Sequence, residues 1–146
     1  MSKEALKEAF VFTYDRMRRF QGEWHLERQL MFPAHVFLDS DDEAALTEEL
    51  RCCAVMDVLS KEKGAILYVR KNEERFMTSL CGENHHLGMS KGVIKNGLTY
   101  VTEGPLWGLE ERICQIDRHK RLARLKVPGI FGAGRILAGL EIVDKC

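Results

Sequence analysis

The sequence lacks a long apolar run. None of its runs approaches the roughly 20 apolar residues that a membrane-spanning helix needs, and the first ten residues, MSKEALKEAF, lack the apolar core of a signal peptide. With 45% apolar and 30% charged residues, the composition is ordinary for a globular protein. We therefore expect a cytoplasmic protein that has no membrane partner.

The five cysteines are odd in number and show no C-x-x-C spacing, so the sequence predicts neither a disulfide framework nor a zinc ribbon. Two features could support metal or nucleophile chemistry, the pair His85-His86 and Cys114 near His119. Adjacent histidines in such a Gly- and Asn-rich segment usually lie in a solvated loop, and a strand Cys usually packs as a small apolar residue. Because no nucleophile, base and orienting group occur together, we expect no catalysis, no cofactor and no metal.

Net charge is also absent, with 22 Lys and Arg against 22 Asp and Glu. The two parts of the chain nevertheless differ. Residues 1–90 contain 12 Lys and Arg against 16 Asp and Glu, whereas residues 91–146 contain 10 against 6. Such asymmetry indicates two modules, the second of which is inclined toward a polyanion.

A hairpin is predicted within residues 5–40. Their aromatic and β-branched content is typical of strands, and the turn signal at 21–23 divides them into two arms. Basic and aromatic side chains gather near the tip, namely Arg16, Arg18, Arg19, Trp24, His25 and Arg28. This pattern indicates either a solvated hairpin end or a contact with an anionic ligand.

The apolar stretch LMFPAHVFL occupies residues 30–38. Strand alternation divides its side chains into two faces, with Phe32, Ala34, Val36 and Leu38 on one and Met31, His35 and Phe37 on the other. Both faces are apolar, so the strand is either buried on both sides or presents one side to a partner. Pro33 indicates an edge or a kink at its start.

Two helices are predicted between this strand and residue 82. Ser40 and Glu43 form a capping box that begins the first, which is amphipathic. The second runs from about Asn72 to Cys81 and stops at Gly82. A short strand, VMDVLS, is predicted between them at 55–60.

The pattern changes after residue 82. The polar, Gly-bearing segment ENHHLGMSKG, residues 83–92, is predicted to be a linker. Five short strands with Gly or Pro at most corners then predict a small closed barrel in residues 91–146. One barrel loop is strongly basic, and it indicates either a solvated turn or an anion contact; its residues are Arg118, His119, Lys120 and Arg121.

These motifs resemble the NusG family of transcription elongation factors. The segment LTYVTEGPLWGLEERICQIDRHKRLARLKV, followed by Ile130-Phe131-Gly132 and LAGLEIV, is similar to the family's KOW module. LMFPAHVFLDS resembles the Phe-Pro-Gly-Tyr-Val-Phe-Val strand of its N-terminal domain. Within the family, RMRRFQGEWHLERQLMFP, MSKGVI and IDRHKRLA are most similar to the LoaP-type antiterminator paralogues.

The resemblance implies an α+β fold in two domains. Residues 1–82 would form a NusG N-terminal-type α/β sandwich, residues 83–92 a linker, and residues 93–146 a five-stranded SH3-like KOW β-barrel. The family's N-terminal domain begins with a Trp-Tyr-Val-type strand and a helix, and this chain starts roughly where that helix ends. We therefore expect the first strand and helix to be missing, so that the N-terminal domain is truncated.

The resemblance also implies a function without catalysis. A protein of this family binds the clamp region of RNA polymerase, and LoaP-type members bind a leader RNA hairpin and promote terminator read-through. The barrel would recruit a further partner, a ribosomal protein or a termination factor. The alternative is a KOW-containing ribosome-associated RNA-binding protein, because KOW barrels also occur in ribosomal proteins.

The resemblance divides the candidate residues between two partners. Polymerase requires an exposed apolar row with a polar rim, for which the candidates are Met31, Phe32, His35 and Phe37. RNA requires phosphate-neutralising side chains with stacking partners. The candidates for RNA are Arg16, Arg18, Arg19, Trp24, Arg28, Arg118, His119, Lys120 and Arg121.

Overall fold

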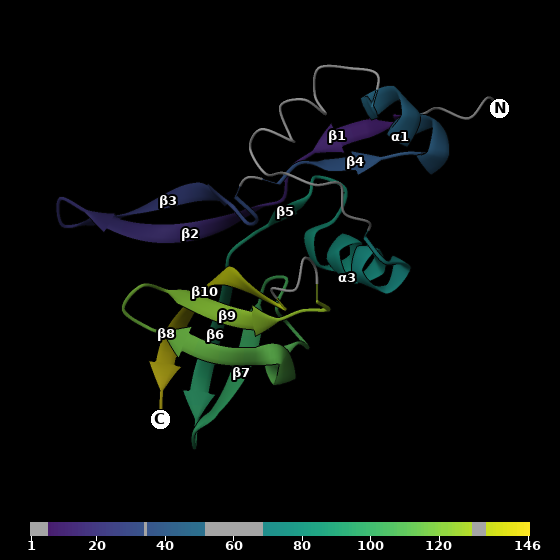
Figure 1. The fold of residues 1–146 in the computed structure, drawn as a ribbon. Helices are drawn as coiled ribbons and strands as arrows, with labels where there is room; N and C mark the ends of the chain where they lie inside the picture. The colour runs from purple at the N-terminus through teal and green to yellow at the C-terminus, as the bar shows by residue number, and fades with distance from the viewer. Residues whose placement is uncertain (1–5, 34, 52–68, 130–133) are drawn as a thin grey trace. The chain divides into compact units, whose positions relative to one another are not determined.

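The computed structural model of the chain describes residues 6–33, 35–51, 69–129 and 134–146 (Figure 1). In these ranges the fold is mixed α and β, mostly strands, with two α-helices. The chain divides into two compact units. Residues 1–11 and 34–68 form the first unit, and residues 12–33 and 69–146 form the second.

In the first unit a two-stranded ribbon precedes a helix. Strand β1 (Glu8–Phe10) pairs antiparallel with β4 (Phe37–Asp39), and α1 (Glu43–Arg51) follows. The rings of Phe10 and Phe37 stack on one face of the ribbon, 5.7 Å between centroids. This contact contributes to the burial of Phe37, which is 7% exposed.

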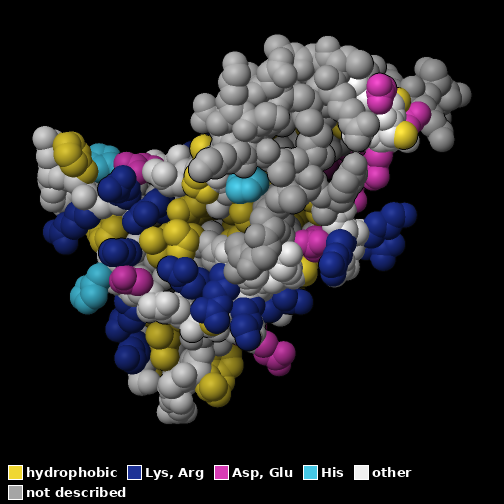
Figure 2. Space-filling view, viewed as in Figure 1, with side chains coloured by type: hydrophobic (Ala, Val, Ile, Leu, Met, Phe, Trp, Pro, Cys, Tyr) yellow, Lys and Arg dark blue, Asp and Glu magenta, His cyan; other side chains and the backbone are white. Residues whose placement is uncertain are grey.

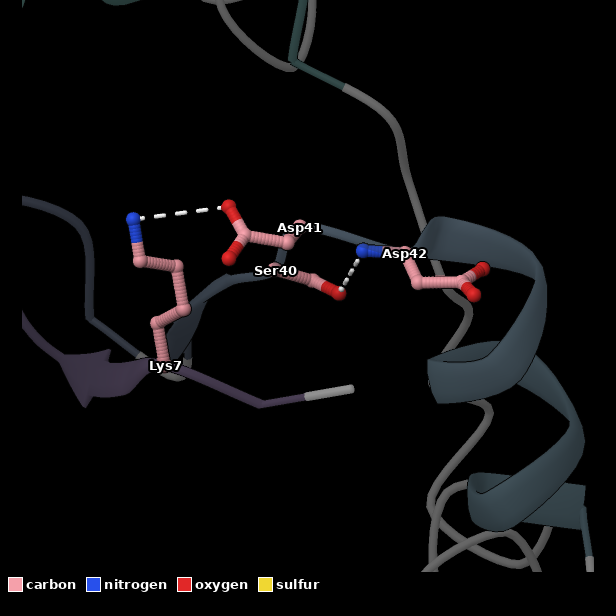
Figure 3. Close-up of polar contacts among 4 residues, drawn as sticks. All are labelled: Lys7, Ser40, Asp41 and Asp42. Carbon is pink, nitrogen blue, oxygen red and sulfur yellow. Dashed lines mark hydrogen bonds and ion pairs between the residues drawn. The ribbon is translucent and has the colours of Figure 1, made fainter. Parts of the chain in front are cut away.

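The cap of α1 differs from the predicted capping box. Asp42 Oδ1 accepts the backbone N–H of Ala45 at 3.1 Å, which makes Asp42 the N-cap. Ser40 instead accepts the N–H of Asp42 through its Oγ at 3.0 Å, and Lys7 pairs with Asp41 at 3.4 Å (Figure 3). The prediction that Ser40 caps the helix is wrong by two residues, because the first-turn N–H of Ala45 is satisfied by the Asp42 carboxylate.

The predicted hairpin is confirmed in the second unit. Strands β2 (Thr13–Phe20) and β3 (Glu23–Leu30) pair antiparallel from end to end. Both turn residues have positive φ, 52° at Gln21 and 80° at Gly22, as a two-residue type I′ turn requires. Strand β5 (His86–Leu87) adds to the other side of β2 in parallel, so the sheet order is β3-β2-β5.

The strand predicted over residues 30–38 is not continuous. Strand β3 ends at Leu30, and β4 begins only at Phe37. Met31 and Phe32 are both buried, which breaks the predicted alternation of faces. Because the two strands belong to different compact units, the intervening residues connect units instead of extending a sheet. Ala34 lies outside the described residues.

Helix α3 (Lys71–Cys81) confirms the second predicted helix. Its buried residues include Met77, Leu80 and Cys81. Gly82, at φ 72°, ends the helix by donating its backbone N–H to the carbonyl of Thr78 at 2.9 Å. The strand predicted at 55–60 lies outside the described residues.

The C-terminal part forms a five-stranded sheet in the order β7-β6-β10-β9-β8. The strands are β6 (Ser90–Lys95), β7 (Leu98–Glu103), β8 (Ile113–Asp117), β9 (Leu122–Lys126) and β10 (Arg135–Lys145). Strand β10 is parallel to β6 and antiparallel to β9. The five predicted strands are therefore confirmed.

The predicted closure into a barrel is not found, because β7 and β8 are the two edges of this sheet within the described residues. The short 3-10 helix η1 (Glu110–Arg112) lies between them in sequence. Glu110 Oε1 accepts the backbone N–H of Val101 in β7 at 3.3 Å. A side chain thus satisfies an edge donor that a neighbouring strand would otherwise use.

The hairpin packs directly on the five-stranded sheet. A Cβ atom at Gly139 in β10 would lie 2.5 Å from the carbonyl oxygen of Asp15 in β2. The two backbones therefore approach as closely as only glycine permits.

The segment predicted to be a linker, residues 83–92, contains β5 and the start of β6. Its residues Leu87 and Ser90 are fully buried. The domain boundaries at 82 and 93 stay a prediction.

Candidate nucleic-acid interface

The register of the hairpin sorts its basic residues onto two faces. Residues directly opposite each other in an antiparallel pair share a face, and successive residues alternate. Arg19 lies opposite Trp24, and Arg28 lies opposite Asp15, so these four share one face, here called the Trp24 face. The opposite face, here called the Phe20 face, holds Arg16, Arg18, Phe20, Glu23, His25 and Glu27.

A second basic segment reaches the Trp24 face from the far end of the sequence. The guanidinium carbon of Arg121 lies 4.0 Å from the centroid of the Trp24 ring, which is a cation–π contact. Arg121 also pairs with Glu141 of β10 at 3.6 Å. Its φ of 54° lies in the left-handed region, at the last position of the turn.

The remaining residues of the β8–β9 turn face solvent. Arg118, His119 and Lys120 are exposed. Asp117 Oδ1 accepts the backbone N–H of Lys120 at 3.0 Å, which fixes the turn. The turn therefore presents cations beside the hairpin, because its last residue is already in contact with Trp24.

The Phe20 face combines cations with an aromatic pair. Arg18 pairs with Glu27 at 3.6 Å, and both side chains are largely exposed. The rings of Phe20 and His25 meet edge to face at 6.3 Å. Arg16 is half-buried, and its Nε has no hydrogen-bond partner within the part of the chain that the structure describes.

On the face drawn in Figure 2, Lys and Arg side chains are spread over the region of the hairpin and the five-stranded sheet, with fewer Asp and Glu among them. The structure thus joins the two basic segments predicted to bind RNA. Sequence analysis missed Phe20 and Glu141. Phe20 could have been found from its position directly before the turn signal at 21–23. No local sequence pattern indicates the ion pair of Glu141 with Arg121.

The four predicted polymerase-binding residues do not form one exposed row. Met31, Phe32 and Phe37 are buried, and the ring of Phe32 packs edge to face on Phe12 at 6.0 Å. Met31 and Phe32 belong to the second unit, whereas His35 and Phe37 belong to the first. Of the four, His35 alone is exposed. The exposed apolar side chains of this segment are instead Val36 and Leu38.

The residues considered for other chemistry have structural contacts. His86 Nδ1 lies 2.7 Å from Thr13 Oγ1, and His86 Nε2 lies 2.8 Å from Asp15 Oδ1. His86 therefore fastens β5 to β2, and the interpretation of the histidine pair as a solvated loop is wrong for this residue. Cys114 is exposed and donates to the carbonyl of Arg124 at 3.2 Å.

No group of three or more His, Cys, Asp or Glu in the described ranges could hold a metal ion. The described helices include none with the length and apolar content to cross a membrane. Comparison with known protein families finds no matching family model, and no curated protein matches the chain.

Proposed function

We propose that this chain is a NusG-type, LoaP-like transcription antitermination factor that binds RNA polymerase and a leader RNA hairpin to promote terminator read-through. Its N-terminal residues would form part of a NusG-type domain, and its five C-terminal strands would correspond to a KOW module. The alternative is a ribosome-associated RNA-binding protein that contains the same module. Neither function requires catalysis.

The observation that carries the RNA-binding part is the contact between Arg121 and Trp24. It brings together two basic segments that are far apart in the sequence, 16–28 and 118–121. A cluster of cations that also contains aromatic side chains suits RNA, because the cations neutralise phosphates and an exposed ring stacks on bases. A purely structural cation–π contact would not require exposed cations on both segments, yet Arg18, Arg19, Arg118 and Lys120 are all exposed.

The polymerase-binding part is supported by a different surface. Val36 is 68% exposed and Leu38 is 41% exposed, next to exposed His35. Apolar side chains exposed together on a short segment suit a protein partner. We therefore propose that Val36, Leu38 and His35 contact polymerase, while the buried Phe37 supports the strand from beneath.

The RNA-binding part is tested by the salt dependence of affinity. The full chain is titrated into a fluorescein-labelled RNA hairpin at several salt concentrations, and anisotropy gives Kd. The double variant Arg18→Ala, Arg19→Ala should bind more weakly and lower the slope of log K against log salt by about one for each phosphate that it no longer neutralises. Arg75→Ala is the matched control, because Arg75 is an exposed cation on α3.

An unchanged slope in the double variant would refute these phosphate contacts.

The wider function is tested by terminator read-through with purified bacterial RNA polymerase, on templates with and without the leader of the operon that encodes the chain. Read-through that depends on the leader supports RNA-directed antitermination. RNA binding without read-through would favour the ribosome-associated protein instead.

A further inference from the structure

The aromatic side chains on the two faces of the hairpin differ in what covers them. On one face the Trp24 ring is half-buried, with the Arg121 guanidinium at 4.0 Å. On the other face Phe20 is 63% exposed and touches His25 only edge to face. A large apolar ring that is exposed to water at a hairpin tip is suited to contact a ligand.

We propose that the tip of the β2–β3 hairpin binds the unpaired bases of an RNA loop, with Phe20 as the stacking residue and Arg18 and Arg19 as phosphate ligands. This inference deepens the proposed function and rests on its RNA-binding part. It assigns a role to Phe20, and it makes Trp24 a residue that positions the hairpin against the β8–β9 turn.

The charges around Phe20 favour an RNA ligand over an apolar protein surface or a lipid. Arg18 shares the face of Phe20, and Arg19 immediately precedes it on the opposite face. A nucleotide offers both a flat base and an anionic phosphate, which match a ring flanked by guanidinium groups. Glu23 lies directly opposite Phe20, so one carboxylate also borders the ring.

The turn geometry favours an unpaired loop over a duplex. The two-residue turn at Gln21 and Gly22 leaves Phe20 in the last paired position, so the ring lies at the very end of a narrow ribbon. Duplex RNA has a deep, narrow major groove that side chains do not read, whereas loop bases are splayed out and accessible. The major groove of B-form DNA does admit a two-stranded ribbon, so duplex DNA is the competitor to test.

The experiment measures anisotropy of the full chain with four labelled probes: a single-stranded RNA, an RNA hairpin with an open loop, a blunt RNA duplex and a blunt DNA duplex. We expect the hairpin and the single strand to bind more tightly than either duplex. Phe20→Ala should weaken binding to these two probes about tenfold, the equivalent of about 1.4 kcal/mol, which falls in the range for one stacked base. Phe20→Trp should retain it.

Leu98→Ala is the matched control, since Leu98 is 61% exposed on β7. Circular dichroism and a thermal melt establish that each variant is folded. Equal binding to either duplex, or equal effects of Phe20→Ala and Leu98→Ala on a folded chain, would overturn the inference while leaving RNA binding intact. Failure of every RNA probe to bind would refute the proposed RNA-binding function itself, and the inference with it.

Discussion

At Cys81 the fold removes most of the reactivity that a thiol has in water. The side chain is 7% exposed at the end of α3. Burial disfavours the charged thiolate, and it raises the pKa of Cys81 from 9.0 to about 12. Because the thiolate is the nucleophile, Cys81 is a core residue and no candidate for covalent chemistry near neutral pH.

Alkylation measures this difference directly. With iodoacetamide at mildly alkaline pH, the exposed residues Cys114 and Cys146 should be labelled and Cys81 should not. In urea all three should react. Peptide mass spectrometry distinguishes the sites, and labelling of Cys81 at the rate of Cys114 in the folded chain would contradict its burial.

The same burial has a consequence for stability. Between pH 9 and about 12 the unfolded chain loses the Cys81 proton while the folded chain keeps it. The unfolded state then binds fewer protons, so the free energy of unfolding falls as pH rises. The contribution of Cys81 is fully present below pH 9 and is lost toward pH 12.

At the scale of single elements, the contact between the hairpin and the β8–β9 turn can be measured by a double-mutant cycle. Arg121 and Trp24 should couple by about 0.5–1 kcal/mol, because both are only half-buried. Urea unfolding of Arg121→Ala, Trp24→Ala and the double variant gives this coupling energy. Arg118→Ala is the control, since Arg118 is exposed in the same turn and should not couple to Trp24.

Elements with strong local signals were predictable. The turn at Gln21 and Gly22 and the stop at Gly82 both depend on a glycine that adopts positive φ. These local signals fix the ends of the hairpin and of α3 without any reference to the rest of the chain. The five C-terminal strands were also predictable from local signals, namely short runs of alternating apolar and polar residues bounded by Gly or Pro.

Elements that depend on distant partners were not predictable. Residues 86 and 87 look like a linker, yet they pair with β2, which lies about seventy residues earlier in sequence. The contact of Trp24 with Arg121 joins residues almost a hundred positions apart. Whether the five strands close into a barrel also depends on contacts at the sheet edges, such as that between the Glu110 carboxylate and the Val101 N–H. The alternation of apolar and polar residues in the sequence does not predict such contacts.

At the scale of the whole molecule, the proposed function assigns polymerase and RNA to different units. Val36 and Leu38 lie in the first unit, and the basic residues of the hairpin and the turn lie in the second. The double variant Val36→Ser, Leu38→Ser should therefore bind polymerase more weakly and retain its affinity for the RNA hairpin. Pull-down with purified polymerase and RNA anisotropy on one preparation measure both.

The variant Phe37→Ala distinguishes loss of the polymerase contact from loss of folding. Phe37 is buried against Phe10, so its truncation to Ala should lower stability by about 3–5 kcal/mol, as for other buried Phe residues. Loss of polymerase binding in that variant would then reflect unfolding of the ribbon. If the Val36 and Leu38 double variant kept full polymerase affinity, the partner would contact another surface.

The close approach at Gly139 has a consequence for synthesis on the ribosome. Strand β2 is synthesised about 120 residues before the β10 backbone that packs on it. At about 5–20 residues per second, the hairpin waits roughly 6–25 s for that partner. During this interval the hairpin lacks the β10 backbone on which it packs in the folded chain, so this contact can form only after Gly139 has been synthesised.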